Sequence, residues 1–192
     1  MYHSGNRELQ TMFGSTALAD RLVEKLHRTR FNDADRAFID SVPFFFLASA
    51  DDHGRPDCSF KGGAPGFVRV VAEDLLVFPD YDGNGMFKSL GNIRVNPHVG
   101  LLFMGMGATP RRLRVNGEAS VVFNDPLQSA FEGAQALVRV VPRDIFPNCP
   151  RYIPNAETGE PSAYVPCAGE PRKEPAWKSF EDFREVVPPR RT

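Results

Sequence analysis

Residues 58–70 of the chain read CSFKGGAPGFVRV. Three glycines, Gly62, Gly63 and Gly66, fall within five residues between two strand-like runs. Because glycine lacks a Cβ atom, such a stretch lets a flat ligand or another part of the backbone approach closely. The residues themselves are compatible with two structures, a ligand cradle and a plain glycine loop between strands.

A second informative stretch follows at residues 79–92, which read PDYDGNGMFKSLGN. The pattern predicts the end of a strand, a turn of glycine and asparagine, and a helix over about 84–95. N–H groups at a helix start are open and attract anions, and Lys88 and Ser89 add a cation and a hydroxyl. The stretch therefore indicates a phosphate-binding site. The alternative is an ordinary capped helix with a solvated lysine.

Working outward from these two stretches, the chain alternates short strand-like runs with tight turns. We expect strands at about 44–50, 57–61, 67–72, 75–79, 99–104, 111–123 and 136–142. We expect further helices at about 7–13, 16–29, 33–41 and 125–135. Several short strands joined by tight turns, with few helices between them, favour a β-barrel over a parallel α/β sheet.

Three regions follow from this pattern. Residues 1–42 are expected to form a helical segment packed on the barrel, and residues 43–146 the barrel itself. Residues 147–192 hold nine of the 17 prolines, so they can form little regular structure. We expect an extended C-terminal tail that lies over the body or over a partner.

Composition excludes several classes of function. With 23 Lys and Arg against 24 Asp and Glu, the net charge of −1 argues against bulk binding to nucleic acid. The longest apolar runs are strand-sized, and nothing resembles a signal peptide, so no membrane partner is expected. Three cysteines without a Cys-x-x-Cys motif favour a reducing compartment, hence the cytoplasm. No histidine lies at metal-ligand spacing from a cysteine, so no metal site is predicted.

The two stretches, in this order, resemble the FMN-binding split-barrel family that includes pyridoxamine 5'-phosphate oxidase. The similarity runs over about 35–117, with weaker support to about 153. The chain is most similar to related flavin-binding proteins that share the motifs SxKGGxPGFVRV, DGNGM and NPxVGLLF, here at 59–70, 82–86 and 96–103. The resemblance implies a mainly β (α+β) fold, a six- to seven-stranded antiparallel split β-barrel with flanking helices. It also implies a homodimer with flavin sites at the interface.

The same resemblance implies which residues hold the cofactor. The positions that match are Ser59, Lys61, Gly62, Gly63, Asn84, Met86, Lys88, Ser89 and Arg112. The first four would line the flavin ring and its ribityl chain, and Asn84, Lys88 and Ser89 would hold the phosphate. Arg112 stands where the family usually has a glutamine that contacts the flavin from the neighbouring subunit.

The implied function is FMN-dependent oxidoreduction of a small organic substrate. The chain departs from the oxidase itself, because it lacks the RxVLLK and SRK segments and the C-terminal Trp and Arg. Trp177 lies in a proline-rich context that does not match, so pyridoxamine phosphate oxidase activity is not expected. No catalytic side chain is identified. The alternatives are a non-catalytic flavin carrier or sensor, and a relative that uses deazaflavin or haem.

Overall fold

The computed structural model describes residues 1–107, 109–168, 171 and 173–189. The helices are α1 (Ser4–Met12), α2 (Thr16–Leu26), α3 (Asp33–Ser41) and α4 (Lys88–Val95), with short 3-10 helices η1 (Gln128–Ala130) and η2 (Ala176–Ser179). The strands are β1 (Phe44–Ala50), β2 (Pro56–Gly62), β3 (Arg69–Ala72), β4 (Leu75–Tyr81), β5 (His98–Gly105), β6 (Arg111–Val122) and β7 (Ala134–Asn148).

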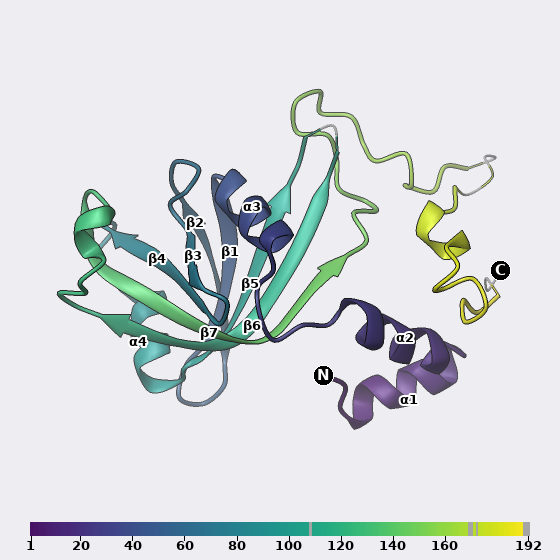
Figure 1. Cartoon of the computed structure of the whole chain (residues 1–192), viewed down its shortest axis with the longest axis horizontal. Coiled ribbons are helices and arrows are strands. Elements are labelled where there is room, and N and C mark those ends of the chain that lie inside the picture. The colour runs from purple at the N-terminus through teal and green to yellow at the C-terminus, as the bar shows by residue number, and fades with distance from the viewer. Residues whose placement is uncertain (108, 169–170, 172, 190–192) are drawn as a thin grey trace. The chain divides into compact units, whose positions relative to one another are not determined.

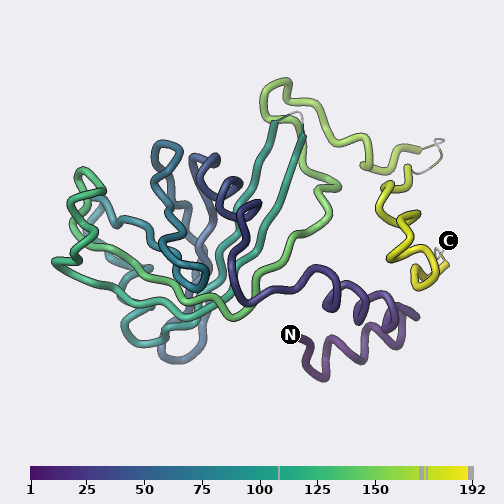
Figure 2. The backbone as a smooth tube through the Cα atoms, viewed as in Figure 1, coloured from purple at the N-terminus to yellow at the C-terminus, as the bar shows by residue number. Residues whose placement is uncertain are grey.

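The seven strands form one antiparallel sheet in the order β2-β1-β5-β6-β7-β4-β3 (Figure 1). Its longest pair is β6 and β7, which run side by side along most of their length (Figure 2). Among the described residues no pairing joins β2 to β3, so the sheet curls without closing. The predicted antiparallel split barrel is therefore confirmed.

The chain divides into two compact units. The barrel unit comprises Arg28–Gly105 and Arg111–Asn148, and so contains α3, α4 and every strand. The other unit comprises the described residues of 1–27, 106–110 and 149–192. It therefore brings the N-terminal helices α1 and α2 together with the C-terminal segment.

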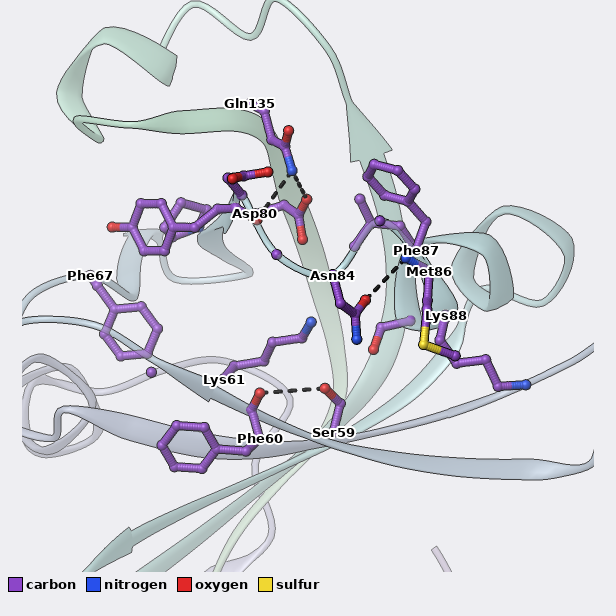
Figure 3. Close-up of a pocket in the computed structure, with 18 residues that line it drawn as sticks. Ser59, Phe60, Lys61, Phe67, Asp80, Asn84, Met86, Phe87, Lys88 and Gln135 are labelled. Carbon is purple, nitrogen blue, oxygen red and sulfur yellow. Dashed lines mark hydrogen bonds between the residues drawn. The ribbon is translucent and has the colours of Figure 1, made fainter.

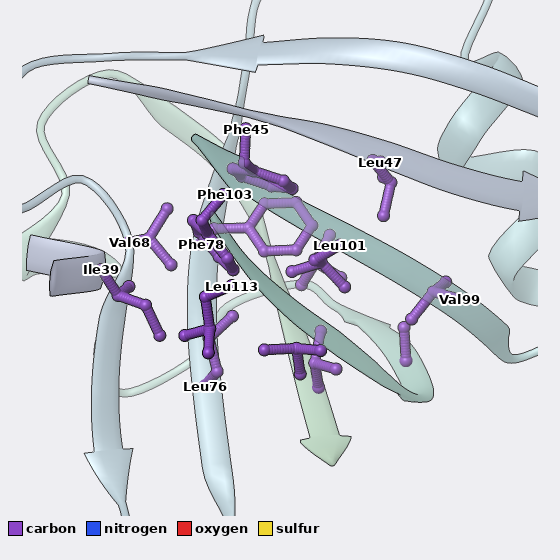
Figure 4. Close-up of a cluster of buried hydrophobic side chains, with 14 of the residues drawn as sticks. Ile39, Phe45, Leu47, Val68, Leu76, Phe78, Val99, Leu101, Phe103 and Leu113 are labelled. Atoms are coloured by element: carbon purple, nitrogen blue, oxygen red, sulfur yellow. The ribbon is translucent and has the colours of Figure 1, made fainter. Parts of the chain in front are cut away.

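Strand alternation builds the barrel core. Along β1, Phe45 and Leu47 are fully buried, whereas Phe44 and Phe46 point the other way. The Phe45 ring packs against the rings of Phe78 and Phe103, with centroids 5.0 and 5.1 Å apart (Figure 4). Truncating such a ring to alanine removes about 3–5 kcal/mol of stability, so this aromatic group is central to the fold.

Helix α3 joins the barrel through its first turn and its apolar face. The Asn32 side chain caps the helix by accepting a hydrogen bond from the Asp35 N–H, 2.9 Å away. Asp35 is buried and in turn accepts two hydrogen bonds from the Arg28 guanidinium. Phe38 and Ile39, on the apolar face, are buried in the core.

The smaller unit is held by contacts between α2 and the C-terminal segment. Arg21 donates a hydrogen bond of 2.8 Å to the Asp182 carbonyl, and Lys25 pairs with the Asp182 carboxylate at 2.8 Å. The Trp177 ring meets the Phe183 ring edge-on, with centroids 5.7 Å apart. The proline-rich segment therefore has little regular structure yet is docked through side chains.

Two helices differ from the sequence-based expectation. The helix expected over 125–135 is only the short η1, because Asp125 accepts the Leu127 N–H and Gly133 adopts a left-handed φ of 77°. Helix α4 begins at Lys88 and not at Asn84, since Gly85 and Phe87 both have positive φ. Glycine accepts that conformation readily, whereas for Phe87 it is strained.

Among the described residues, no helix combines the length and the apolar character needed to cross a bilayer. The same residues contain no group of three or more His, Cys, Asp or Glu side chains placed to hold a metal ion.

Candidate functional site

A cavity of about 430 Å³ lies between β2, the end of β4 and the start of α4. Figure 3 shows that side chains from separate stretches of the chain surround it. Its lining comprises Ser59, Phe60, Lys61, Gly62, Phe67, the residues of 79–90 and Gln135. The fold thus brings together the two stretches that the sequence singled out, in a cavity of the size that small ligands and cofactors occupy.

Of the residues predicted to hold a cofactor, most line this cavity. Those that do are Ser59, Lys61, Gly62, Asn84, Met86, Lys88 and Ser89. Gly63 lies next to the lining, and Arg112 lies elsewhere on the barrel.

Strand β2 supplies the polar floor of the cavity because it is an edge strand. Ser59 and Lys61 pair with Leu47 and Phe45, so their side chains leave β2 on the barrel-interior side. At the edge of the sheet this side opens into the cavity and not into the core. Figure 3 shows the Lys61 side chain reaching toward Asn84 across the gap, while the Phe60 ring points away from it.

Gly62, which ends β2, and Gly63, which follows it, lie close to phenylalanine rings. A Cβ atom at Gly63 would lie 2.7 Å from the Phe67 ring, and one at Gly62 would lie 2.7 Å from the Phe60 ring. Gly62 also lines the cavity. The local structure of this glycine stretch is therefore set by its own phenylalanines, and Gly62 also forms part of the cavity wall.

The loop before α4 forms the upper wall. The Asn84 side-chain oxygen accepts a hydrogen bond of 3.0 Å from the Met86 N–H, which fixes the turn. Phe87, the residue before the helix, has a φ of 48°, a left-handed conformation that costs a non-glycine residue about 1 kcal/mol or more. Among the described residues no side chain caps α4, so its first N–H groups remain available to an anion.

The first turn of α4 adds one buried and one exposed side chain. Ser89 is buried at 5% exposure and lines the cavity. Lys88 is exposed, and in Figure 3 its chain extends away from Lys61. Lys61 is consequently the lysine whose ammonium already faces the cavity, and Lys88 needs a change of rotamer to do so.

Helix α4 is fixed to the β1–β2 hairpin through its middle and its C-terminal end. The Asn92 amide donates a hydrogen bond to the buried Ser49 hydroxyl on β1, and the Asn96 amide donates one of 3.2 Å to the Asp51 carbonyl in the hairpin turn. Because β2 belongs to the same hairpin, these contacts hold α4 on the hairpin that carries Ser59. The polar floor and the helix start are thus parts of one framework.

The charged side chains that line the cavity do not form ion pairs with one another. Lys61 and Lys88 supply two cations, and Asp80 and Asp82 supply two carboxylates. Among the described residues none of these four forms an ion pair. The cavity therefore offers separate cationic and acceptor groups to a ligand.

Two lining residues carry polar groups that sequence reasoning missed. The sequence analysis did not single out Asp80, which lies on β4 and lines the cavity. Gln135 precedes the strand expected over 136–142, whereas β7 begins at Ala134 and carries Gln135 to the cavity. No local motif marks Gln135, because only the pairing of β7 with β4 brings it there.

Arg112 cannot reach the cavity of its own chain. It lies on β6, and β1 and β5 stand between β6 and β2 in the sheet. Three strand spacings amount to about 14 Å. Arg112 lies opposite Met104 on β5, so these two side chains point to the same face of the sheet. Leu102, two residues from Met104, points to that face as well and lies opposite Phe46 on β1. Arg112 and Phe46 therefore belong to the same outer face of the barrel.

These features define the class of protein: an antiparallel split barrel with a cavity of mixed charge at its open edge. The chain belongs to the pyridoxamine 5'-phosphate oxidase family, whose sequence model matches residues 31–146. A comparison with curated proteins gave no match.

Solved structures with a similar fold carry low sequence identity. A putative pyridoxamine 5'-phosphate oxidase from Lactobacillus delbrueckii is 18% identical, covering 62% of this chain and 95% of that one, with a TM-score of 0.49. An FMN-binding protein from Syntrophomonas wolfei is 11% identical, covering 75% and 93%, with a TM-score of 0.46. A FAD-binding protein from Mesorhizobium loti is 13% identical, covering 65% and 99%, with a TM-score of 0.44.

Proposed function

We propose that this protein binds FMN in the cavity between β2 and α4 and acts as a flavin-dependent oxidoreductase on a small organic substrate. The observation that carries the proposal is that Lys61, the Ser59 and Ser89 side chains and the uncapped start of α4 line one cavity. A cation, hydroxyl groups and open helix N–H groups are the donors that hold a phosphate. The family membership supports the same assignment.

The residues present fit this cofactor. The resemblance placed Lys61 at the flavin ring and ribityl chain, but we assign it to the phosphate together with the start of α4. Asn84 would hold the turn above the phosphate, and Lys88 would turn inward to add a second cation. The flat ring would lie along the wall that Gly62 forms beside β2, with Met86 also in the lining. Bound flavin supplies the electron chemistry, while the chain supplies position and electrostatics.

We further propose that two copies of the chain form a homodimer that completes the site. Phe60 and Phe46 are 62% and 36% exposed on the outer face of β1 and β2, and their rings pack against each other and against Phe44. Burying such a cluster is favourable at roughly 25 cal/mol for each Å² of apolar surface. Because Arg112 lies on this face and not at its own cavity, it would contact the flavin bound to the partner.

The test begins with the purified protein. An absorption spectrum with flavin bands, or their appearance on titration with FMN, is expected, together with tighter binding of FMN than of riboflavin. Equal affinity for FMN and riboflavin would refute the proposed phosphate-binding site. Bands typical of haem or deazaflavin would assign the cavity to a different cofactor.

Catalysis is tested separately from binding. An oxidoreductase is expected to have its bound flavin reduced by NADH or NADPH and then reoxidised in a substrate-dependent manner. A flavin that binds tightly but is neither reduced nor reoxidised in this way would make the protein a flavin carrier or sensor.

A further inference from the structure

A β-bulge places Gln135 at the cavity. In the pairing of β4 with β7, Asp80 lies opposite Ala136 and Tyr81 lies opposite Ala134, so Gln135 is an extra residue without a partner in β4. Bulges of this kind re-aim one side chain, and they are common next to binding sites. Here the re-aimed side chain lines the cavity.

The Gln135 amide holds the end of β4 in place. Its Nε2 group donates one hydrogen bond of 3.1 Å to Asp80 Oδ2 and another of 3.1 Å to the Tyr81 carbonyl (Figure 3). Both hydrogens of the amide group are therefore used, one on a side chain and one on the backbone. This double contact restricts the rotation of the Asp80 carboxylate.

The Asp80 carboxylate keeps most of its acceptor capacity. Among the described residues, Gln135 is the only group that donates a hydrogen bond to it, and no cation pairs with it. An ionised carboxylate can accept about four hydrogen bonds. Figure 3 shows Asp80 on the side of the cavity opposite Ser59 and Lys61.

The position of Asp80 relative to the proposed phosphate-binding site determines which part of a bound ligand contacts Asp80. Asp80 is at the end of β4, and the chain then runs through Asn84 directly to the start of α4. Because Asp80 and the start of α4 line the same cavity, a ligand whose phosphate lies at α4 can place the atoms next to that phosphate against Asp80. Because a carboxylate only accepts hydrogen bonds and repels other anions, those atoms must carry donors such as hydroxyl groups.

We propose that Asp80, positioned by Gln135, is a specificity-determining residue that accepts hydrogen bonds from a hydroxylated chain of the bound cofactor. The inference rests on the proposed flavin function and assigns the ribityl hydroxyl groups to this carboxylate. Gln135 is a positioning residue, because it acts on the ligand through Asp80. The cavity consequently selects a flavin by its polyhydroxyl chain as well as by its phosphate.

The experiment compares riboflavin with lumiflavin, which has the same ring but no hydroxylated chain and no phosphate. The full-length protein is titrated with each by fluorescence quenching. Wild type is expected to prefer riboflavin. In Asp80→Ala this preference should fall about tenfold or more, since a hydrogen bond to a charged group is lost, while lumiflavin affinity changes less than about twofold.

Three further variants isolate the contact. Asp80→Asn keeps an acceptor oxygen and should retain part of the preference. Gln135→Ala leaves the carboxylate but frees its rotation, so it should give an intermediate loss with lumiflavin affinity unchanged. Asp74→Ala removes an exposed carboxylate just before the other end of β4 and should leave both affinities unchanged. Circular dichroism and thermal unfolding confirm that each variant is folded.

The outcomes separate this inference from the proposed function. If wild type binds neither FMN nor riboflavin, the proposed flavin site is wrong. If wild type binds both and Asp80→Ala keeps the full riboflavin preference, the flavin site stands and the role of Asp80 is refuted. A parallel loss of lumiflavin and riboflavin affinity would assign Asp80 a structural role only and would equally refute the inference.

Discussion

The Asn92 side-chain amide donates a hydrogen bond of 3.0 Å to the Ser49 hydroxyl, in a buried contact between α4 and β1. Asn92→Ala should lower the free energy of unfolding by about 1–3 kcal/mol, because the Ser49 hydroxyl is left buried without its donor. Denaturant unfolding of both single variants and of the double variant with Ser49→Ala measures the coupling. Additive single effects would show that the contact is not energetically coupled.

Lys61 faces the cavity, so its positive charge should attract the phosphate of FMN. Lys61→Ala is expected to weaken FMN binding about tenfold to a hundredfold while riboflavin affinity changes less than about twofold. Lys88→Ala should act in the same direction with a smaller effect, because its ammonium must first turn inward. Arg94→Ala, in the last turn of the same helix, is the matched control and should leave both affinities unchanged.

Asp125 and Arg139 form an ion pair whose carboxylate is fully buried. Hydrogen bonding from the Arg139 guanidinium lowers the pKa of Asp125, against the opposing effect of burial. Because the pKa is lower in the folded than in the unfolded state, the ionised carboxylate stabilises the fold at pH values above the unfolded-state pKa of about 3.9. This contribution is lost as pH falls through the folded-state pKa. Wild type should therefore lose stability from about pH 5 downward.

Asp125→Asn should remove this pH dependence and lower stability near pH 7 by about 3 kcal/mol, because Arg139 is left without its partner. Urea unfolding between pH 3 and pH 7 measures both effects. Asp20→Asn, which breaks the exposed pair of Asp20 with Arg7, should change stability by less than about 1 kcal/mol. A wild-type curve with the same slope as Asp125→Asn would contradict the assignment.

Much of the fold could be predicted from local sequence, and the site only in part. The run of apolar residues predicted a strand at 44–50, where β1 lies, because a buried strand is recognisable from its own residues. The start of α4 was placed four residues too early, since the left-handed conformation of Phe87 is imposed by the loop and is not signalled by its side chain. Gln135 was missed because a bulge depends on the register of two strands that are distant in sequence.

The exposed phenylalanines on β1 and β2 lead to a prediction about assembly. Phe46→Lys places a charge on the outer face and should convert the proposed dimer to a monomer in sedimentation velocity at micromolar concentration. FMN affinity should fall with it, because Arg112 of the second copy is removed from the site. Val71→Lys, a comparable change at an exposed position of β3, should leave the dimer intact. A monomeric wild type with FMN fully bound would refute both proposals.

The C-terminal segment provides the last prediction. All strands of the barrel unit lie within residues 28–148, so a chain that ends before Pro154 should retain a folded barrel. Helix α2 should loosen, because Arg21 and Lys25 both lose Asp182 as a partner. Hydrogen exchange should therefore rise in residues 16–26 and stay unchanged in β1 and β5. Asp182→Ala keeps the carbonyl that Arg21 contacts and removes the carboxylate that pairs with Lys25, so it should give a smaller rise confined to α2. Uniformly faster exchange across the strands of the truncated chain would show that the barrel depends on this segment for its stability.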